Sequence, residues 1–555
     1  MIPINRTYAP LQAFVEELYR CGMRHAVTSP GSRNAPLALT LAAQEGVEAV
    51  SVLDERAAGF AALGMAKASG RPVAVTCTSG TAAANLHPAV VEAWEARVPL
   101  LVLSADRPPE LRDVGAGQAI DQIKLYGSAA KWFVEVGTHE PSRETAIHHR
   151  ALACRAYWTA AGGRPGPVHL NFPLREPLAP VPEDLDAADW QGRPDGRPWT
   201  RVREHASAPH ADDVHALAER IAAEPRGVIV CGPTGERIAE QAARLAAASG
   251  WPLLAEPTSG VRCGDHDRAH VIAHYDVLLR IQDFVSQHRP GLVLRVGDMP
   301  TSKPLRAFVA ETSQIVVDPH GAWHEPTRTA ELLLQAAAEP TLGALAAAVE
   351  MRAEGATTRG GDGDGWLAEW READAKVWAA VEGAPDGFEG KVLARLEPAL
   401  PDKAVVWISS SMPIRDVEAY FPQSPKRLRF LANRGANGID GVVSSAMGAA
   451  IATGLPTWVL IGELALQHDA GGLLAARRAS VSLEIVCINN GGGGIFDFLP
   501  VAEHADPAAS ETHIATPSDG VELAALWPGL REIRTDRRQN VALHRELVER
   551  VAQSL

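Results

Sequence analysis

The chain has 555 residues, which is too long for one hydrophobic core and predicts about three domains. It carries 53 Lys and Arg against 67 Asp and Glu, and the net charge of −14 argues against nucleic acid or an anionic membrane as the main partner. Six scattered cysteines form no C-x-x-C pair and no apolar run approaches the ~20 residues that span a bilayer, so we expect a protein of the reducing cytoplasm.

Short β-branched runs alternate with longer alanine-rich stretches along the whole chain. This rhythm predicts an α/β fold of three doubly wound domains, each a parallel sheet covered by helices. The expected parts are a first domain at 1–180, a linker at 181–212, a second domain at 213–345, a linker at 346–370 and a third domain at 371–555.

The expected strands lie within apolar stretches between helical segments. In chain order these stretches are 25–30, 48–54, 72–79, 99–106, 166–173, 226–235, 251–260, 291–298, 313–321, 404–410, 428–433, 457–462 and 482–490. One helix is expected over "ERAAGFAALGMAKASG", ending at Gly70. Because ligands of doubly wound sheets sit beyond the carboxyl ends of the strands, the loops after these strands are the candidate sites.

Two loops of the first segment carry candidate ligand-binding groups. "TSPGSRNAP" holds Ser32 and Arg33, and the arginine offers a fork to a carboxylate, although a polar turn with a helix cap explains the loop as well. "LDERAAGF" holds Asp54, which fits a helix cap, and Glu55, which could project as an acid or base.

Three further loops carry weaker signals. In "TCTSGTAAAN", the N–H groups near Ser79, Gly80 and Thr81 could hold an anion or a ring nitrogen. Arg107 follows a strand and Gln118 lies in a glycine-rich loop, which lies on a surface or lines a site. Lys303 follows a strand of the second segment, where a lone lysine is usually solvated.

Two arginines end adjacent strands of the third segment. Ser411 and Arg415 follow "WISS", and Arg434 begins "RGANGIDG". The pair suggests a dianion site, while ion pairs with Asp416 or Asp440 are an equally good explanation.

The strongest signal combines "LIGEL" with "CINNGGGGIF". Glu463 follows Gly462 at the end of one strand, and Asn490 ends a later strand before four glycines that include Gly492. Successive parallel strands would place carboxylate and carboxamide side by side, and glycines let the backbone approach a ligand. Carboxylate, amide and backbone oxygens suit Mg²⁺ that also binds phosphate oxygens and water.

Together these loops resemble the thiamine diphosphate-dependent enzymes. Within them the chain is similar over nearly its whole length to the 2-succinyl-5-enolpyruvyl-6-hydroxy-3-cyclohexene-1-carboxylate (SEPHCHC) synthases of menaquinone biosynthesis. The ordered matches are "TSPGSRNAPL", "DERAAGFAALGMAK", "TSGTAAANLHPAV", "SADRPPELRDVGAGQAIDQ", "PTSKPL", "NRGANGIDG" and "NNGGGGIFDFLP". The resemblance implies pyrimidine-binding, central and diphosphate-binding domains in a homodimer or homotetramer.

The implied reaction is decarboxylation of 2-oxoglutarate and conjugate addition of the resulting carbanion to isochorismate, with release of CO₂. Both substrates are dicarboxylates, which the basic residues would bind. By resemblance, the residues toward isochorismate are Ser32, Arg33, Arg107, Gln118 and Lys303, and those toward 2-oxoglutarate are Ser411, Arg415 and Arg434. Glu55 matches the acid that hydrogen-bonds the aminopyrimidine ring of the cofactor.

The resemblance also implies the cofactor contacts. Glu463, Asn490 and the Gly492 carbonyl would hold Mg²⁺ or Mn²⁺ on the diphosphate of thiamine diphosphate. The other implied contacts are Ser79, Gly80, Thr81, Ile439, Gly462, Ile495 and Phe496.

The sequence departs from the family pattern in three places. Glu463 stands where aspartate is usual, Pro304 stands where some relatives carry a second basic residue, and the short stretch from Ser510 to Arg534 predicts an abbreviated last βα unit. Two alternative functions follow: another thiamine diphosphate-dependent 2-oxoacid decarboxylase or carboligase, or a catalytically impaired homologue with a binding role.

Overall fold

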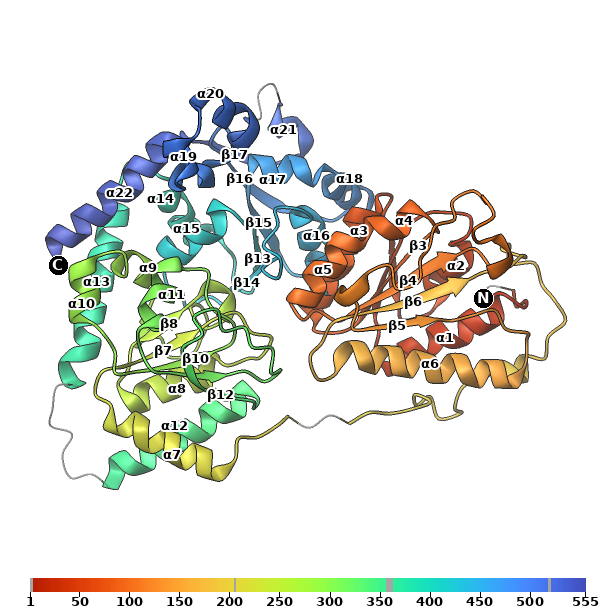
Figure 1. The fold of residues 1–555 in the computed structure, drawn as a ribbon, viewed down its shortest axis with the longest axis horizontal. Helices are drawn as coiled ribbons and strands as arrows, with labels where there is room; N and C mark the ends of the chain where they lie inside the picture. Colours follow the sequence, from red (N-terminus) through yellow and green to blue (C-terminus); the bar gives the residue numbers. More distant parts are fainter. Residues whose placement is uncertain (1–2, 204–205, 356–362, 518–520) are drawn as a thin grey trace. The chain divides into compact units, whose positions relative to one another are not determined.

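The computed structural model of the chain describes residues 3–203, 206–355, 363–517 and 521–555 (Figure 1). In these residues the strands form three parallel sheets with flanking helices, which confirms the predicted α/β fold. The chain divides into two compact units. Unit 1 consists of Met1–Glu204, Asn433–Thr457 and Ala465–Leu483, and unit 2 of His205–Ala432, Trp458–Leu464 and Glu484–Leu555.

The first sheet lies in unit 1 and has the strand order β2-β1-β3-β4-β6-β5. Its strands are β1 (His25–Thr28), β2 (Glu48–Ser51), β3 (Val73–Cys77), β4 (Leu100–Asp106), β5 (Trp132–Glu135) and β6 (Pro167–Pro173). One face carries α1 (Tyr8–Cys21), α2 (Ala35–Ala43) and α6 (Arg143–Ala161), whose apolar side chains form one core with the strands. The other face carries α3 (Glu55–Ser69) and α5 (His87–Glu95) (Figure 1).

Helix α3 begins and ends where the sequence predicts. Asp54 caps it by accepting the Arg56 backbone N–H at 2.9 Å, and Gly70 ends it in the left-handed conformation at φ 67°. Its partner in unit 1 is α16 (Val442–Thr453). A Cβ on Gly64 would lie 1.9 Å from the Ser445 carbonyl oxygen, so glycine permits this close helix packing.

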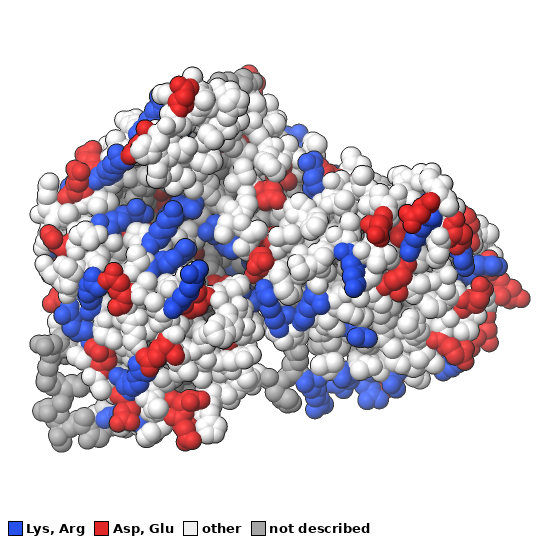
Figure 2. Space-filling view, viewed as in Figure 1, with Lys and Arg blue, Asp and Glu red and all other residues white. Residues whose placement is uncertain are grey.

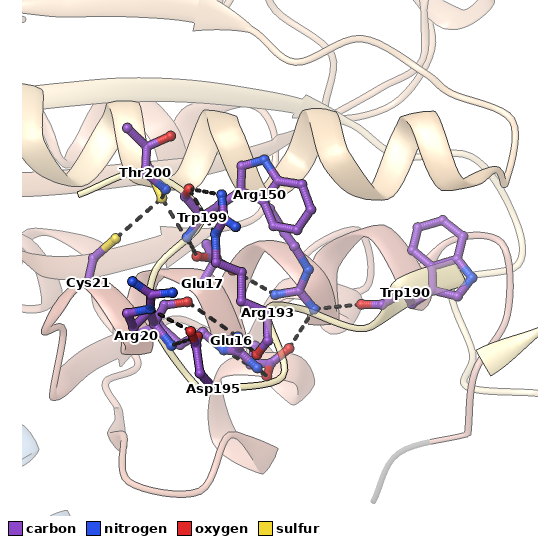
Figure 3. A network of polar contacts seen from close by, with 12 residues as sticks. Glu16, Glu17, Arg20, Cys21, Arg150, Trp190, Arg193, Asp195, Trp199 and Thr200 are labelled. Carbon is purple, nitrogen blue, oxygen red and sulfur yellow. Dashed lines mark hydrogen bonds and ion pairs between the residues drawn. The ribbon is translucent and has the colours of Figure 1, made fainter. Parts of the chain in front are cut away.

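A buried polar network ties residues 190–200 to the helices of unit 1 (Figure 3). Arg150 of α6 donates to Glu17 at 2.7 Å and to Glu16 at 2.6 Å, and it also reaches the Trp190 carbonyl at 2.5 Å. Glu17 in turn accepts the Trp199 backbone N–H. Much of the stretch expected as the linker 181–212 is therefore fixed against α1 and α6.

The second sheet lies in unit 2 and has the order β12-β11-β10-β7-β8-β9. Its strands are β7 (Gly227–Cys231), β8 (Leu253–Ala255), β9 (Val271–Ile272), β10 (Leu292–Val296), β11 (Gln314–Val317) and β12 (Ala330–Leu334). One face packs on α7 (Ala211–Ala223), α8 (Ala239–Ser249) and α12 (Ala338–Gly355). The other packs on α9 (Tyr275–Leu278), α11 (Lys303–Ala310) and α13 (Gly363–Glu382).

The third sheet, also in unit 2, has the order β14-β13-β15-β16-β17. Its strands are β13 (Val405–Ile408), β14 (Arg429–Ala432), β15 (Thr457–Gly462), β16 (Glu484–Asn489) and β17 (Arg531–Arg534). One face packs on α14 (Glu389–Ala394) and α15 (Met412–Tyr420). The chain reverses direction across the sheet between β13 and β15, so their carboxyl ends border a crevice of the kind that binds ligands in such sheets.

Four strands were missed by the sequence analysis, and all four lie at sheet edges. They are β5, β9, β12 and β17. Both β5 and β17 are only partly buried along their length, so they lack the continuous apolar run that marks a central strand.

Two segments of the chain contain more secondary structure than the sequence predicts. The stretch 346–370 holds the end of α12 and the start of α13 on either side of residues that are not described. The expected abbreviation of the last βα unit is not seen in the described residues, because β17 pairs with β16 and is followed by α22 (Arg537–Ser554). Within the described parts of the chain, helices capable of crossing a membrane are absent.

Candidate active site

The loops after β1 and β3 meet at the point in unit 1 where the strand order of the first sheet reverses. A Cβ on Gly31 would lie 2.4 Å from the Thr78 Cβ, so these two loops touch and glycine is required at the contact. Ser32 and Arg33 extend from the first loop, and Ser79 to Thr81 from the second. Five predicted site residues thus share one sheet edge.

Arg33 and Arg107 lie close enough to influence each other. Arg33 Nη1 donates to the Leu174 carbonyl at 2.7 Å, and its Nε is buried without a hydrogen-bond partner. Burial, followed by the charge of Arg107, lowers the pKa of the Arg33 guanidinium. Two partly buried arginines with little acidic compensation favour an anion between them.

Gln118 joins this group through its backbone. Its carbonyl accepts the Ser79 hydroxyl at 2.8 Å, and Arg107 Nη2 donates to the preceding Gly117 carbonyl at 2.9 Å. Gln118 adopts φ 56° and its side chain is exposed beside Arg107. The predicted residues of the β3 and β4 loops are therefore brought together.

The sequence analysis missed the residue that supports these loops. Gln122 is buried, accepts the Gly80 N–H at 2.9 Å, and donates to the Ala105 carbonyl and to Asn171. It is one of two glutamines in "GQAIDQ", and nothing local distinguishes a buried scaffold glutamine from an exposed one.

Glu55 is the first residue of α3 and is half-buried. Its charge contributes, after burial itself, to the raised pKa of the Cys77 thiol, which places it beside the end of β3. An acid at this helix end is favoured by the helix dipole, so the local structure explains its position but assigns it no ligand.

Arg434 and Ile439 lie in the loop before α16, in unit 1, and both are half-buried. Glu92, on α5, accepts the backbone N–H groups of Gly435 at 2.8 Å and Ala436 at 2.6 Å. This second anchor was also missed, because one acid on an apolar helix resembles an ordinary solvated residue.

Unit 2 contains a cavity of about 590 Å³. It is lined by Lys303 of α11, Arg415 of α15, Arg280 and Arg289 from the segments after α9 and α10 (Gln282–Gln287), and Ile495 from the segment after β16. Figure 2 shows Lys and Arg side chains gathered around a hollow where Figure 1 places α9, α11 and α15. The structure thus brings together Lys303, Arg415 and Ile495, which come from three separate predicted loops.

Buried acids lie beneath this basic lining. Asp276 pairs with Arg280 at 2.8 Å, and the Tyr275 hydroxyl donates to Glu418 at 2.7 Å. Burial, followed by the charge of Glu256, raises the pKa of Glu418 to about 8. Burial thus favours the protonated form of Glu418, which offsets the positive charge of the cavity less than an ionised acid would.

Ser411 and Arg415 stand at the carboxyl end of β13. Ser411 has a positive φ of 73°, and its carbonyl accepts Nη1 of Arg415 one turn along α15. Burial lowers the pKa of Arg415 against the opposing effect of Asp416. The proposed ion pair with Asp416 is absent from the ion pairs of the described residues, where Asp416 instead faces His544 at 3.4 Å.

Glu463 follows β15 and is 2% exposed. Its Oε1 accepts the Gly492 N–H at 2.6 Å, which joins the two predicted halves of the metal site. Burial raises the pKa of Glu463, although the N–H groups of Gly492 and Asn490 oppose this. The longer side chain reaches the glycine loop through its hydrogen bond with Gly492.

The donor set fits a hard divalent cation. Asn490 Oδ1 is buried and has no hydrogen-bond partner, whereas Asn490 Nδ2 donates to Glu389 at 3.1 Å. A buried amide oxygen without a donor is costly unless a ligand completes it. In the described residues no group of three His, Cys, Asp or Glu could hold a metal, so such a cation would need amide, backbone or phosphate oxygens beside Glu463.

The glycines after Asn490 shape the loop. Gly492 has φ 138°, and a Cβ there would lie 2.8 Å from the Ala515 carbonyl oxygen. Ile495 and Phe496 follow in a 3-10 helix, Gly494–Phe498, and are half-buried. The loops after β1, β3 and β4 thus form one cluster in unit 1, and unit 2 holds two, the cavity and the loop around Glu463.

Comparison with known proteins identifies the family of this chain. Residues 11–125 match the family described as thiamine pyrophosphate enzyme, N-terminal TPP binding domain. Residues 186–408 match the middle domain of thiamine pyrophosphate enzymes.

Curated relatives match nearly the whole chain. A 2-succinyl-5-enolpyruvyl-6-hydroxy-3-cyclohexene-1-carboxylate synthase from Geobacillus kaustophilus is 43% identical, covering 98% of this chain and 97% of the relative. Synthases of the same name from Myxococcus xanthus and Natronomonas pharaonis are 41% and 42% identical, covering 98% and 89% of this chain and 97% and 85% of those proteins. The chain belongs to the SEPHCHC synthase family of thiamine diphosphate-dependent enzymes.

Proposed function

We propose that this chain is a SEPHCHC synthase of menaquinone biosynthesis, a transferase that decarboxylates 2-oxoglutarate and adds the product to isochorismate with release of CO₂. The observation that carries the proposal is the pairing of two basic clusters. Arg33 and Arg107 flank one sheet edge, and Lys303 and Arg415 line a cavity of about 590 Å³. A reaction of two dicarboxylates needs more cationic groups than a decarboxylase that binds a single 2-oxoacid.

The substrate-binding residues are assigned by the substrate that each would contact. Ser32, Arg33, Arg107 and Gln118 would bind isochorismate together with Lys303. Arg415, Arg434 and Ser411 would bind 2-oxoglutarate. Fork-shaped guanidinium groups hold carboxylates in two contacts and so orient both substrates before reaction.

Thiamine diphosphate and Mg²⁺ or Mn²⁺ would occupy the ends of the strands. Glu463, Asn490 and the Gly492 carbonyl would hold the metal, and Ser79, Gly80, Thr81, Ile439, Gly462, Ile495 and Phe496 would contact the cofactor. When bound, the cofactor supplies the electron sink for loss of CO₂. Glu55 would hold a proton at the aminopyrimidine ring, and the half-buried Ile439 and Phe496 would exclude water.

The domain boundaries and the assembly are part of the same proposal. The pyrimidine-binding domain would occupy 1–180, the central domain 213–345 and the diphosphate-binding domain 371–555. The enzyme would act in the cytoplasm as a homodimer or homotetramer, with Glu55 and Glu463 of one active site supplied by different chains.

A two-substrate assay tests the function. Purified protein with thiamine diphosphate and Mg²⁺ should release CO₂ from 2-oxoglutarate slowly until isochorismate is added, and product should then form in equal amount to CO₂. Mn²⁺ is compared in parallel, and pyruvate replaces 2-oxoglutarate as the control. Equal turnover of pyruvate without isochorismate would show instead a general 2-oxoacid decarboxylase.

A further inference from the structure

The Asn490 side chain can bind a metal in only one of its two amide orientations. Its oxygen is a ligand for hard cations, whereas its NH₂ group repels them. Rotation by half a turn about the last side-chain bond exchanges the two. Some neighbour must therefore decide which end of the amide faces the metal position.

Glu389 is that neighbour. Its Oε1 lies 3.1 Å from Asn490 Nδ2. This oxygen accepts the Thr535 hydroxyl as well, so it acts as an acceptor, selects the NH₂ end of the amide and turns Oδ1 away from itself. Asn490 Oδ1 is then a buried oxygen without a hydrogen-bond partner, which leaves its lone pairs available to a cation.

Glu389 is itself held rigidly. It is the first residue of α14 and is 1% exposed. The same Oε1 accepts the Thr535 hydroxyl at 2.9 Å, and the Glu389 N–H donates to Asn540 at 3.3 Å. A Cβ on Gly390 would lie 2.4 Å from Tyr420, so glycine lets α14 approach α15 closely. These contacts hold the carboxylate beside Asn490.

A purely structural role explains Glu389 less well. No Lys, Arg or His of the described residues forms an ion pair with it, and its side-chain partners are Asn490 and Thr535. Burying an acid without a cation costs stability, and an apolar residue of similar size would avoid that cost. The presence of an acid at position 389 is explained if Asn490 needs the oxygen of Glu389 as a hydrogen-bond acceptor.

We propose that Glu389 is a positioning residue that fixes the Asn490 amide with its oxygen toward the metal and thereby sets the affinity for the divalent cation. This inference rests on the metal site of the proposed function. Outer partners that orient metal ligands typically change affinity by about 10- to 100-fold when removed.

Direct Mn²⁺ binding tests the inference without relying on turnover. Protein with saturating thiamine diphosphate is titrated with Mn²⁺, and unbound Mn²⁺ is measured by electron paramagnetic resonance. Glu389→Met removes the acceptor at similar size and should weaken Mn²⁺ binding by about 10- to 100-fold. Glu389→Gln keeps an acceptor oxygen and should bind within about threefold of the parent, because a hydrogen bond to a neutral acceptor is only modestly weaker.

A double-mutant cycle separates positioning from general destabilisation. In the Asn490→Ala background there is no amide to orient, so adding Glu389→Met should change Mn²⁺ affinity no further. Where Glu389→Met does not fold, as judged by circular dichroism, Thr535→Val substitutes for it. Removing this second donor loosens the Glu389 carboxylate and should weaken Mn²⁺ binding by about two- to threefold.

Three results overturn the inference: parental affinity in a folded Glu389→Met or, failing that, in Thr535→Val; equal losses in Glu389→Gln and Glu389→Met; or additive losses in the cycle. Parental affinity in Asn490→Ala is a different failure, because it removes the proposed metal site itself and the positioning role with it.

Discussion

The two basic clusters of this protein hold their charges in different surroundings. In unit 1, Arg33 and Arg107 are held chiefly by backbone carbonyls, and the nearest acid to Arg33, Glu176, lies 3.6 Å away and is exposed. In unit 2, two arginines at the basic cavity are paired with acids, Arg280 with Asp276 and Arg289 with Glu311. Carbonyl oxygens orient a guanidinium without neutralising it, whereas acids neutralise it unless they are protonated. We therefore expect unit 1 to depend more strongly on single arginines.

The largest effect is expected for Arg33→Met. It removes a buried, oriented cation, so kcat/KM for isochorismate should fall by about 10- to 100-fold while KM for 2-oxoglutarate stays constant. Arg33→Lys should lower kcat/KM for isochorismate nearly as much, because lysine cannot form two parallel hydrogen bonds to a carboxylate. The matched control is Arg6→Met, which removes an exposed arginine paired with Glu183 in the same unit. An equal fall in kcat/KM for isochorismate and for 2-oxoglutarate would contradict the assignment of Arg33 to isochorismate.

Arg415→Met should have the next largest effect. Lys303 and other cations line the same cavity and can partly replace its charge, so kcat/KM for 2-oxoglutarate should fall by about tenfold, with isochorismate KM little changed. Steady-state kinetics in both substrates measure this, and Arg244→Met, an exposed arginine paired with Glu350, is the control. A larger loss than in Arg33→Met would reverse the comparison between the units.

Glu418→Gln tests whether the acid beneath the cavity is protonated. Its pKa is raised in the folded protein from 4.5 to about 8, so its stabilising contribution is present below about 4.5 and is lost as pH rises through about 8. The thermal midpoint of the parent should fall relative to that of Glu418→Gln across this range. A constant difference between the two proteins would mean that Glu418 is already ionised at neutral pH.

The smallest effect is expected for Lys303→Met. Lys303 is exposed at the cavity mouth, so solvent screens its charge and KM for isochorismate should rise by no more than about fivefold. Raising the salt concentration should shrink the difference from the parent further. A salt-independent loss above tenfold would place Lys303 in direct, desolvated contact with substrate.

Much of the fold was predictable because its signals are local. Asp54 and Gly70 mark the two ends of α3 as predicted. Buried central strands such as β4 and β10 are recognisable in the sequence as apolar runs. The edge strands β5 and β17 were missed because partial exposure removes that run. The candidate site residues were found because strand ends in parallel sheets are where ligands bind.

The supporting residues were not predictable in the same way. Gln122, Glu92 and Glu389 are buried polar side chains whose partners are backbone N–H groups or another amide. Their neighbours in sequence do not reveal burial, and a polar residue on a helix is usually solvated. Only the packed structure identifies them as anchors of the site.

The sequence by itself determined the alternation of strands and helices, the loops that carry chemistry and the family, since these depend on order and composition along the chain. The tertiary structure alone decided which of those loops meet. Glu389 reaches Asn490 across 101 residues, and Glu92 reaches Gly435 across 343. Such contacts depend on how whole layers pack, and packing joins residues whose separation along the chain carries no information about their distance in space.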